Sequence, residues 1–185
     1  IILEHFPPTP EGTVAGYHLL TESFRRAFVD RNTKLGDPSF VQVPVTQLTS
    51  KEYARQEAST IDAKRASATG SFSQATGEGV NTTHYSVVDD HGNAVATTTT
   101  LNDLYGSGVY VAAAGIFLND EMDDFAAQPG QPNMYGLVQG EQNAIAPGKR
   151  MLSAMSPTIV LDPKGDLLLV VGSRGGPRII TSVAQ

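Results

Sequence analysis

Asn81-Thr82-Thr83-His84-Tyr85-Ser86-Val87-Val88 carries the strongest structural signal in the chain, because a strand-forming sequence begins abruptly at Thr82. Residues 66–81 before it are dominated by Ser, Ala, Thr and Gly and lack any apolar period, which predicts a flexible linker. From Thr83 to Asp89 the residue types predict a buried strand. A threonine freed by cleavage at this junction would carry both nucleophile and base, because its new α-amino group can take the proton of its own hydroxyl.

Two hairpins are expected after the junction. A strand over residues 94–101 follows the turn residues 90–93, and strands over 158–161 and 167–171 flank the turn 162–166 in the same way. Residues 102–156 between them are rich in Gly, Pro, Asn and Gln, and so long a loop in a compact domain is more often a working surface than idle connection. Gly175-Gly176-Pro177 then leads into a helix, with proline where the first turn tolerates it.

Helices are expected before the junction. Over residues 11–31, apolar residues recur at helical spacing and predict an amphipathic helix; they include Val14, Tyr17, Leu20, Phe24 and Phe28. Thr49-Ser50-Lys51-Glu52 resembles a capping box, in which a hydroxyl and a carboxylate satisfy free amides, and predicts a second helix over residues 50–61.

The composition is that of an ordinary globular protein, with 40% hydrophobic and 17% charged residues among 185. The net charge of −6 and the scattered basic residues argue against nucleic acid or anionic lipid as a partner, and no membrane span is expected. Without cysteine there is no disulfide, thiolate metal site or cysteine nucleophile. The chain begins without methionine and ends within the expected helix, so we expect a piece of a longer protein.

Several groups are candidates for chemistry, and each has a plainer interpretation. Thr82 alone could simply begin a strand, and Gly175-Gly176 could be a tight turn rather than amides aimed at an oxyanion. The four carboxylates within residues 120–124 suit a solvated loop, a calcium site without EF-hand spacing, or a pocket for a cationic amino group, especially if Asn102 shared it. Ser153 is either a loop hydroxyl or a donor to a substrate carboxylate.

Together these motifs, in this order, resemble the γ-glutamyltransferase family of N-terminal-nucleophile hydrolases. The match runs through residues 81–89, 92–96, 100–102, 119–125, 132–137, 149–153, 155–159 and 175–180, and upstream through 30–31, 35–38 and 53–54. It implies an α+β fold, a four-layer αββα sandwich of which this chain is a part. Residues 1–81 would be the end of the large subunit, comprising helices and linker, and residues 82–185 the beginning of the small catalytic subunit.

The resemblance also implies roles. Autocatalytic cleavage between Asn81 and Thr82 would make Thr82 nucleophile and base, with Thr100 holding its hydroxyl and the Gly175 and Gly176 amides binding the oxyanion. Asn102, Glu121 and Asp124 would bind the α-amino end of the glutamyl group, and Ser153 its α-carboxylate. The implied substrates are glutathione and other γ-glutamyl compounds, with water, amino acids or peptides as acceptors. The implied partner is the rest of its own two subunits, in the periplasm or outside the cell, and no cofactor or metal is implied.

Two departures keep other interpretations open. Ala154 stands where the family commonly has a second serine, and Arg174 where a small residue or proline is usual. A cephalosporin or glutaryl acylase, or a poly-γ-glutamate depolymerase, on the same fold is therefore one alternative. A non-catalytic binding or structural domain, whose linker merely joins two layers, is another.

Overall fold

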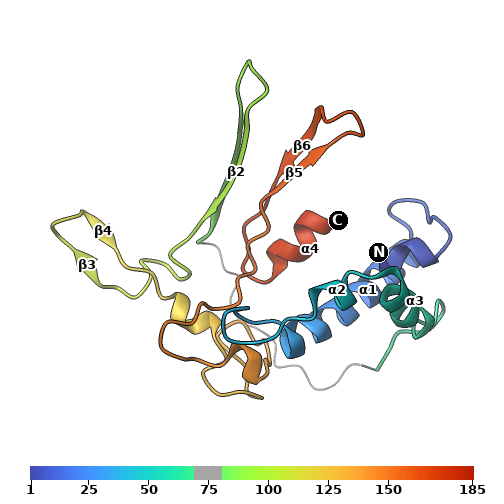
Figure 1. Cartoon of the computed structure of the whole chain (residues 1–185), viewed down its shortest axis with the longest axis horizontal. Coiled ribbons are helices and arrows are strands. Elements are labelled where there is room, and N and C mark those ends of the chain that lie inside the picture. Colours follow the sequence, from blue (N-terminus) through green and yellow to red (C-terminus); the bar gives the residue numbers. More distant parts are fainter. Residues whose placement is uncertain (69–80) are drawn as a thin grey trace. The chain divides into compact units, whose positions relative to one another are not determined.

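The computed structural model describes residues 1–68 and 81–185 and contains both helices and antiparallel hairpins (Figure 1). This mixture confirms the α+β class. The described chain forms two compact units. The first contains residues 1–68, 126–132 and 136–150, and the second contains residues 81–125, 133–135 and 151–185. Most of the expected linker, residues 69–80, lies outside the described residues.

The first unit is built on the helix α1 (Val14–Lys34), with the short helices η1 (Ile2–His5), α2 (Val45–Leu48), α3 (Lys51–Ser59) and η3 (Glu141–Asn143). Thr13 caps α1 by accepting a hydrogen bond from the Gly16 amide at 3.2 Å. The helix runs three residues beyond its predicted end, up to the Gly36-Asp37-Pro38 turn. The small apolar core of the first unit includes Leu19, Ala54, Ala58 and Ile61.

The predicted apolar face of α1 is only partly correct: Leu20, Phe24 and Phe28 are half-buried, but the first two residues of the pattern are exposed. Val14 is 88% exposed and Tyr17 is 52% exposed, whereas the buried positions are Leu19, Glu22, Ser23 and Arg31. Polar bonds explain this choice of face, because the Glu22 carboxylate accepts hydrogen bonds from the Ser67 amide (3.1 Å) and hydroxyl (2.5 Å) and from Arg26 (2.8 Å). Hydrogen bonds from Ser67, and then from Arg26, lower the pKa of Glu22 to about 2, although burial acts in the opposite direction.

The predicted second helix is present as α3, but its capping box is not formed as expected. Ser50 is the N-cap, and its hydroxyl accepts from the Tyr53 amide at 3.1 Å. With the cap at Ser50 rather than Thr49, Glu52 is one residue too early to reach back. Its carboxylate binds the side chains of Arg55 and Gln56.

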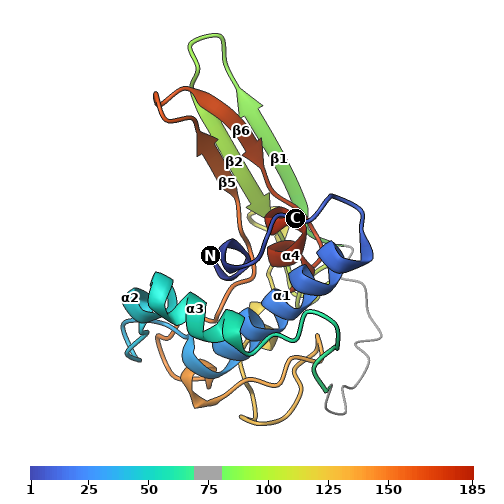
Figure 2. The ribbon, with the colours of Figure 1, turned by 90° about the vertical axis from the view of Figure 1, so that its right-hand side faces the viewer.

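The second unit contains the two predicted long hairpins. Strand β1 (Thr83–Val88) pairs antiparallel with β2 (Ala94–Thr99), and β5 (Thr158–Leu161) with β6 (Leu167–Val171), close to the predicted bounds. The hairpins lie side by side in both views, and the Ser86 hydroxyl donates to the Val170 carbonyl at 3.2 Å (Figures 1 and 2). The helix α4 (Arg178–Ala184) follows β6, with Pro177 at its N-cap.

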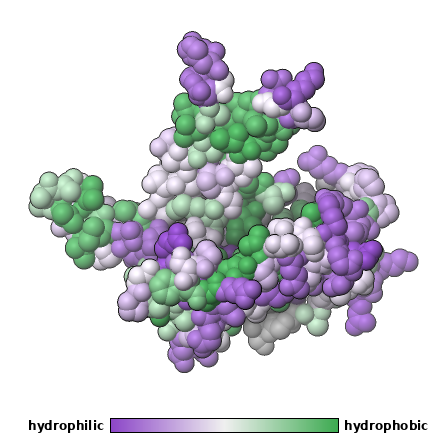
Figure 3. Space-filling model, in the orientation of Figure 1, coloured by the Kyte–Doolittle hydropathy of each residue, from purple (hydrophilic) through white to green (hydrophobic). Residues whose placement is uncertain are grey.

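The prediction that these strands are buried is wrong for this chain. Large apolar side chains on both hairpins are about half exposed, and a hydrophobic surface covers the hairpins below their hydrophilic tips (Figure 3). They include Tyr85, Val87, Val95, Ile159, Leu168 and Leu169. Each hairpin is a separate two-stranded sheet, so within the described unit much of its apolar surface stays uncovered.

The long insert between the hairpins contains strands and a short helix that its composition does not predict. Strands β3 (Tyr110–Val111) and β4 (Ile116–Phe117) form a third hairpin, and the short helix η2 (Glu121–Asp124) follows it. The Phe117 ring packs against Tyr105 and Tyr110, with ring centroids 5.2 and 5.1 Å apart. Part of the remaining insert belongs to the first unit, where the Ala126 amide donates to the Asn143 carbonyl at 2.9 Å.

Replacing Glu22 with Gln should lower the free energy of unfolding of the full-length protein by about 2 kcal/mol at pH 7, because several charge-assisted hydrogen bonds are lost. The folded-state pKa of Glu22, about 2, is below the ordinary 4.5, so its stabilisation is present above pH 4.5 and fades as the pH falls toward 2. Urea unfolding at several pH values should therefore show the variant converging on the wild type in acid. Glu52→Gln, on an exposed side chain, is the control, and equal effects of the two changes would contradict the assignment.

Candidate active site

Thr82 is buried, with 7% of its surface exposed, immediately before strand β1. Its hydroxyl donates to the Thr100 hydroxyl oxygen at 3.2 Å, and the Asn102 amide donates to the same oxygen at 3.0 Å. Thr83 pairs with Thr99 in the sheet, so continuing that register by one residue places Thr82 opposite Thr100. The structure therefore brings together Thr82, Thr100 and Asn102.

Asn102 links this hydroxyl pair to the rest of the unit. It is buried and has a φ of 76°, in the left-handed region that asparagine tolerates better than most residues. Its side-chain Nδ2 lies 3.4 Å from the Asp120 carbonyl and 3.5 Å from the Met134 sulfur. Tyr135 donates its phenol proton to the Asn102 side-chain oxygen.

Tyr135 lies close to the acidic segment. Burial raises the pKa of its phenol to about 12, and the negative charges of Asp124, Glu121 and Asp120 add to the shift. Glu121 and Asp124, the expected ligands of an amino group, both lie on η2. The phenol therefore stays protonated, and remains a hydrogen-bond donor, at any physiological pH.

The glycine pair lies at the start of α4. Gly175 has a φ of +123° and Gly176 a φ of +55°, and their carbonyls accept hydrogen bonds from the Arg178 and Ile179 amides at 3.1 and 3.0 Å. A Cβ on Gly176 would lie 3.0 Å from the Tyr135 ring, so the pair packs closely against the residue that binds Asn102. The backbone thus needs glycine at both positions, whether or not the amides bind an oxyanion.

The remaining predicted residues lie in their own local environments. The exposed Ser153 accepts a hydrogen bond from the Met155 amide at 3.1 Å, within its own segment. Asn81, on the other side of the expected cleavage bond, donates to the Asp103 carboxylate at 3.1 Å. Ala154 is half-buried and Arg174 is exposed.

The sequence pattern does not predict a role for Tyr135. Its connection to Asn102 spans 33 residues and depends on a turn in which its own amide binds the Asn133 side chain at 3.0 Å. The available signal was a lone aromatic residue in a loop rich in Gly, Pro and Asn, which does not reveal a partner. His84 has a clearer structural place, since its ring binds the Thr98 hydroxyl at 2.8 Å and occupies the space where a Cβ on Gly172 would lie.

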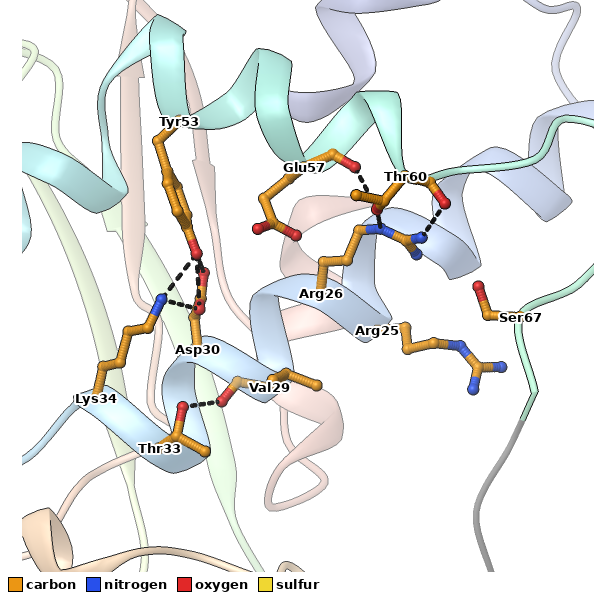
Figure 4. Close-up of a pocket in the computed structure, with 10 residues that line it drawn as sticks. All are labelled: Arg25, Arg26, Val29, Asp30, Thr33, Lys34, Tyr53, Glu57, Thr60 and Ser67. Carbon is orange, nitrogen blue, oxygen red and sulfur yellow. Dashed lines mark hydrogen bonds and ion pairs between the residues drawn. The ribbon is translucent and has the colours of Figure 1, made fainter.

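Two other groups of polar residues fit structural roles. A surface hollow of about 390 Å³ lies between α1 and α3 (Figure 4), where Lys34 binds Asp30 and Tyr53, and Arg26 binds Thr60. The second group, Asp89, Asp90 and His91, is exposed at the β1–β2 turn. There the Asp89 carboxylate accepts from the amides of His91 and Asn93, which stabilises the turn.

Comparison with known proteins assigns this arrangement to a family. The family model of gamma-glutamyltranspeptidase matches residues 1–185. The chain belongs to this family. A glutathione hydrolase proenzyme of Pseudomonas sp. (strain A14) is 49% identical over 185 residues, which is 98% of this chain and 32% of that protein. The chain thus spans about a third of the length of this curated relative.

Solved structures of a gamma-glutamyltranspeptidase and of an acylase also resemble the chain. A mutant gamma-glutamyltranspeptidase of Helicobacter pylori is 59% identical, with a TM-score of 0.53 over 56% of this chain and 55% of that one. A cephalosporin acylase of Bacillus halodurans is 28% identical, with a TM-score of 0.57 over 81% of this chain and 25% of that one. Among the described residues, no helix is long and apolar enough to cross a bilayer.

Gly176→Ala should disturb Tyr135, because the added methyl group meets its ring. The pKa of Tyr135, assigned by difference from a Tyr135→Phe variant in an alkaline absorbance titration, should fall from about 12 toward the ordinary value of about 10. Gly165→Ala is the matched control: Gly165 also has a positive φ, +91°, but open space around it. Both changes should cost about 1 kcal/mol of stability through the backbone. An unchanged Tyr135 pKa in Gly176→Ala would refute the contact.

Proposed function

We propose that the protein containing this chain is a γ-glutamyltransferase with glutathione hydrolase activity, activated by its own cleavage between Asn81 and Thr82. The observation that carries the proposal is the buried Thr82 hydroxyl, which is oriented by Thr100 at the end of a strand. Membership of the gamma-glutamyltranspeptidase family, and relatives named as proenzymes, support it. No histidine or cysteine is needed, because the freed amine supplies the base.

In the cleavage step, the Thr82 hydroxyl oxygen attacks the Asn81 carbonyl carbon. The peptide C–N bond breaks, the nitrogen keeps its electrons and gains a proton, and an ester joins Asn81 to Thr82. Water then hydrolyses this ester, which leaves a carboxylate on Asn81 and a free α-amine on Thr82. Thr100 accepts a hydrogen bond from the attacking hydroxyl, so it sets the orientation of that oxygen.

In turnover, the Thr82 amine takes the hydroxyl proton while the oxygen attacks the γ-carbonyl carbon of glutathione. The proton passes to the leaving amine of cysteinylglycine, and the γ-glutamyl group remains as a threonine ester. Water or the amine of an amino acid or peptide then attacks the ester and restores Thr82. The Gly175 and Gly176 amides bind the oxyanion in both halves, an interaction typically worth about a hundredfold or more in rate.

Substrate recognition follows the charges of the site. Glu121, Asp124 and Asn102 bind the α-ammonium of the glutamyl group, and Ser153 binds its α-carboxylate. The carboxylates of η2 contribute, after burial, to the raised pKa of Tyr135, and their negative charge would attract an ammonium group.

The assembly is proposed to be a heterodimer within a four-layer αββα sandwich. Residues 1–81 are the end of the large subunit, and residues 82–185 the beginning of the small one. The exposed apolar faces of the hairpins suit further strands and helices, supplied by the rest of the protein. We place the protein in the periplasm or outside the cell, with glutathione, other γ-glutamyl compounds and acceptor amino acids or peptides as its small-molecule partners.

Thr82→Ala should leave the full-length protein as one chain and lower γ-glutamyl turnover by about 10⁴-fold or more, because nucleophile and base are lost together. Thr82→Ser should retain part of both cleavage and turnover. Mass spectrometry and a γ-glutamyl-p-nitroanilide assay are the measurements. Thr83→Ala, on the neighbouring exposed threonine, should behave as wild type. Full turnover by an uncleaved chain would sink the proposal.

A second candidate function is a glutaryl-type acylase, favoured by Ala154 and by the similarity to the cephalosporin acylase. A glutaryl group has the carboxylate of a γ-glutamyl group but lacks its α-ammonium. Discrimination between the two therefore depends on the acidic residues of η2 rather than on Ser153.

Asp124→Asn should lower kcat/KM for γ-glutamyl-p-nitroanilide by about 10- to 100-fold, because a charge-assisted bond to the ammonium is lost. The rate with glutaryl-p-nitroanilide should change little. Asp123→Asn, on the exposed neighbour, is the matched control. A protein that turns over the glutaryl substrate alone is an acylase, and the γ-glutamyl assignment is then wrong.

A further inference from the structure

The first compact unit is built from both sides of the Asn81–Thr82 bond. Residues 1–68 come before the bond, whereas residues 126–132 and 136–150 come after it. If the chain is cut as proposed above, this one unit consists of two chains. Non-covalent contacts must then hold it together.

Asp37 makes the most concentrated of these contacts. Its carboxylate, 1% exposed, accepts hydrogen bonds from Arg150 through the backbone amide (2.9 Å), Nε (3.1 Å) and Nη2 (2.8 Å). The Ser39 amide adds a fourth at 3.0 Å. The Arg150 guanidinium, more than the other donors, holds the pKa of Asp37 well below its usual range. The carboxylate is therefore ionised at neutral pH.

The backbone around Asp37 fits against the later segment in the same way. The Gly140 amide donates to the Asn32 carbonyl at 2.9 Å, near the end of α1. A Cβ on Gly36 would lie 2.1 Å from the Gln142 carbonyl oxygen, so no side chain fits at this position. The end of α1 and the turn after it thus form a surface that contacts residues 140–150, and Asp37 is the charged residue of this surface.

We propose that Asp37 is the clamp between the two products of cleavage: it holds the chain that begins at Thr82 on the chain that ends at Asn81 by binding Arg150. A two-pronged bond from a planar guanidinium, plus a backbone amide, fixes direction as well as distance. The Asp30–Lys34 ion pair, at 2.6 Å, lies in the same unit but within one product, so it cannot serve this purpose.

The test uses the full-length protein expressed as two separate chains, divided between residues 81 and 82, so that it does not depend on self-cleavage. The first chain carries an affinity tag, and the second is released from the resin by increasing urea. Asp37→Asn and Arg150→Met should each raise the apparent dissociation constant at a fixed urea concentration by about tenfold or more. The double variant should be no worse than either single change, because both remove one interaction. Asp30→Asn should match the wild type.

Arg150→Lys is the control for misfolding, because the Arg150 side chain is 73% exposed and tolerates substitution. Lysine keeps the positive charge but lacks the planar guanidinium, so this variant should bind more tightly than Arg150→Met and less tightly than the wild type. Release of Asp37→Asn at the wild-type urea concentration, or additive losses in the double variant, would overturn the clamp. Cleavage and γ-glutamyl turnover are measured separately in the undivided chain. If these are absent, the proposed function fails while the association result still decides the clamp.

Discussion

The register of the β1–β2 hairpin is the constraint on which the site depends. The Asp89 carboxylate binds the amides of His91 and Asn93 and closes the turn, so Val88 pairs with Ala94 and Thr83 with Thr99. One residue further, Thr82 meets Thr100. Neighbouring side chains in a strand point to opposite faces. A slip of one residue would therefore separate these hydroxyls and move the side chains of the shifted strand to the opposite face.

The same register separates the two faces of the hairpin. His84 binds Thr98 and Ser86 binds the Val170 carbonyl, so the polar face that carries Thr82 is the one that meets β6. Gly172 extends this contact, since only glycine leaves room for the His84 ring. The opposite face keeps apolar side chains such as Tyr85 and Val87 exposed. The polar contact between the two hairpins thus lies on the same face of β1 as the Thr82 hydroxyl.

The sequence predicted the features that depend on residues close together in the chain. Strands β5 and β6 have their predicted bounds, because β-branched and leucine runs flank a turn with Asp, Pro and Gly. Thr82, Thr100 and Asn102 were predicted from family resemblance, and the structure brings them together. What failed depends on distant partners: the buried face of α1 is set by Ser67, 45 residues from Glu22, and Tyr135 reaches Asn102 across 33 residues. Apolar periodicity contains no information on such polar pairs.

Asn102 connects the Thr82–Thr100 hydroxyl pair to Tyr135 through two different hydrogen bonds. On one side its backbone amide binds the Thr100 oxygen that orients Thr82, and on the other its side chain binds Tyr135, beside the carboxylates of η2. Burial, and then those charges, raise the pKa of the phenol, so Tyr135 stays neutral beside the carboxylates. The α-ammonium group of the proposed substrate would meet negative charge at this segment. Asn102 therefore lies between the Thr82–Thr100 hydroxyl pair and the segment proposed to bind the ammonium group of the substrate.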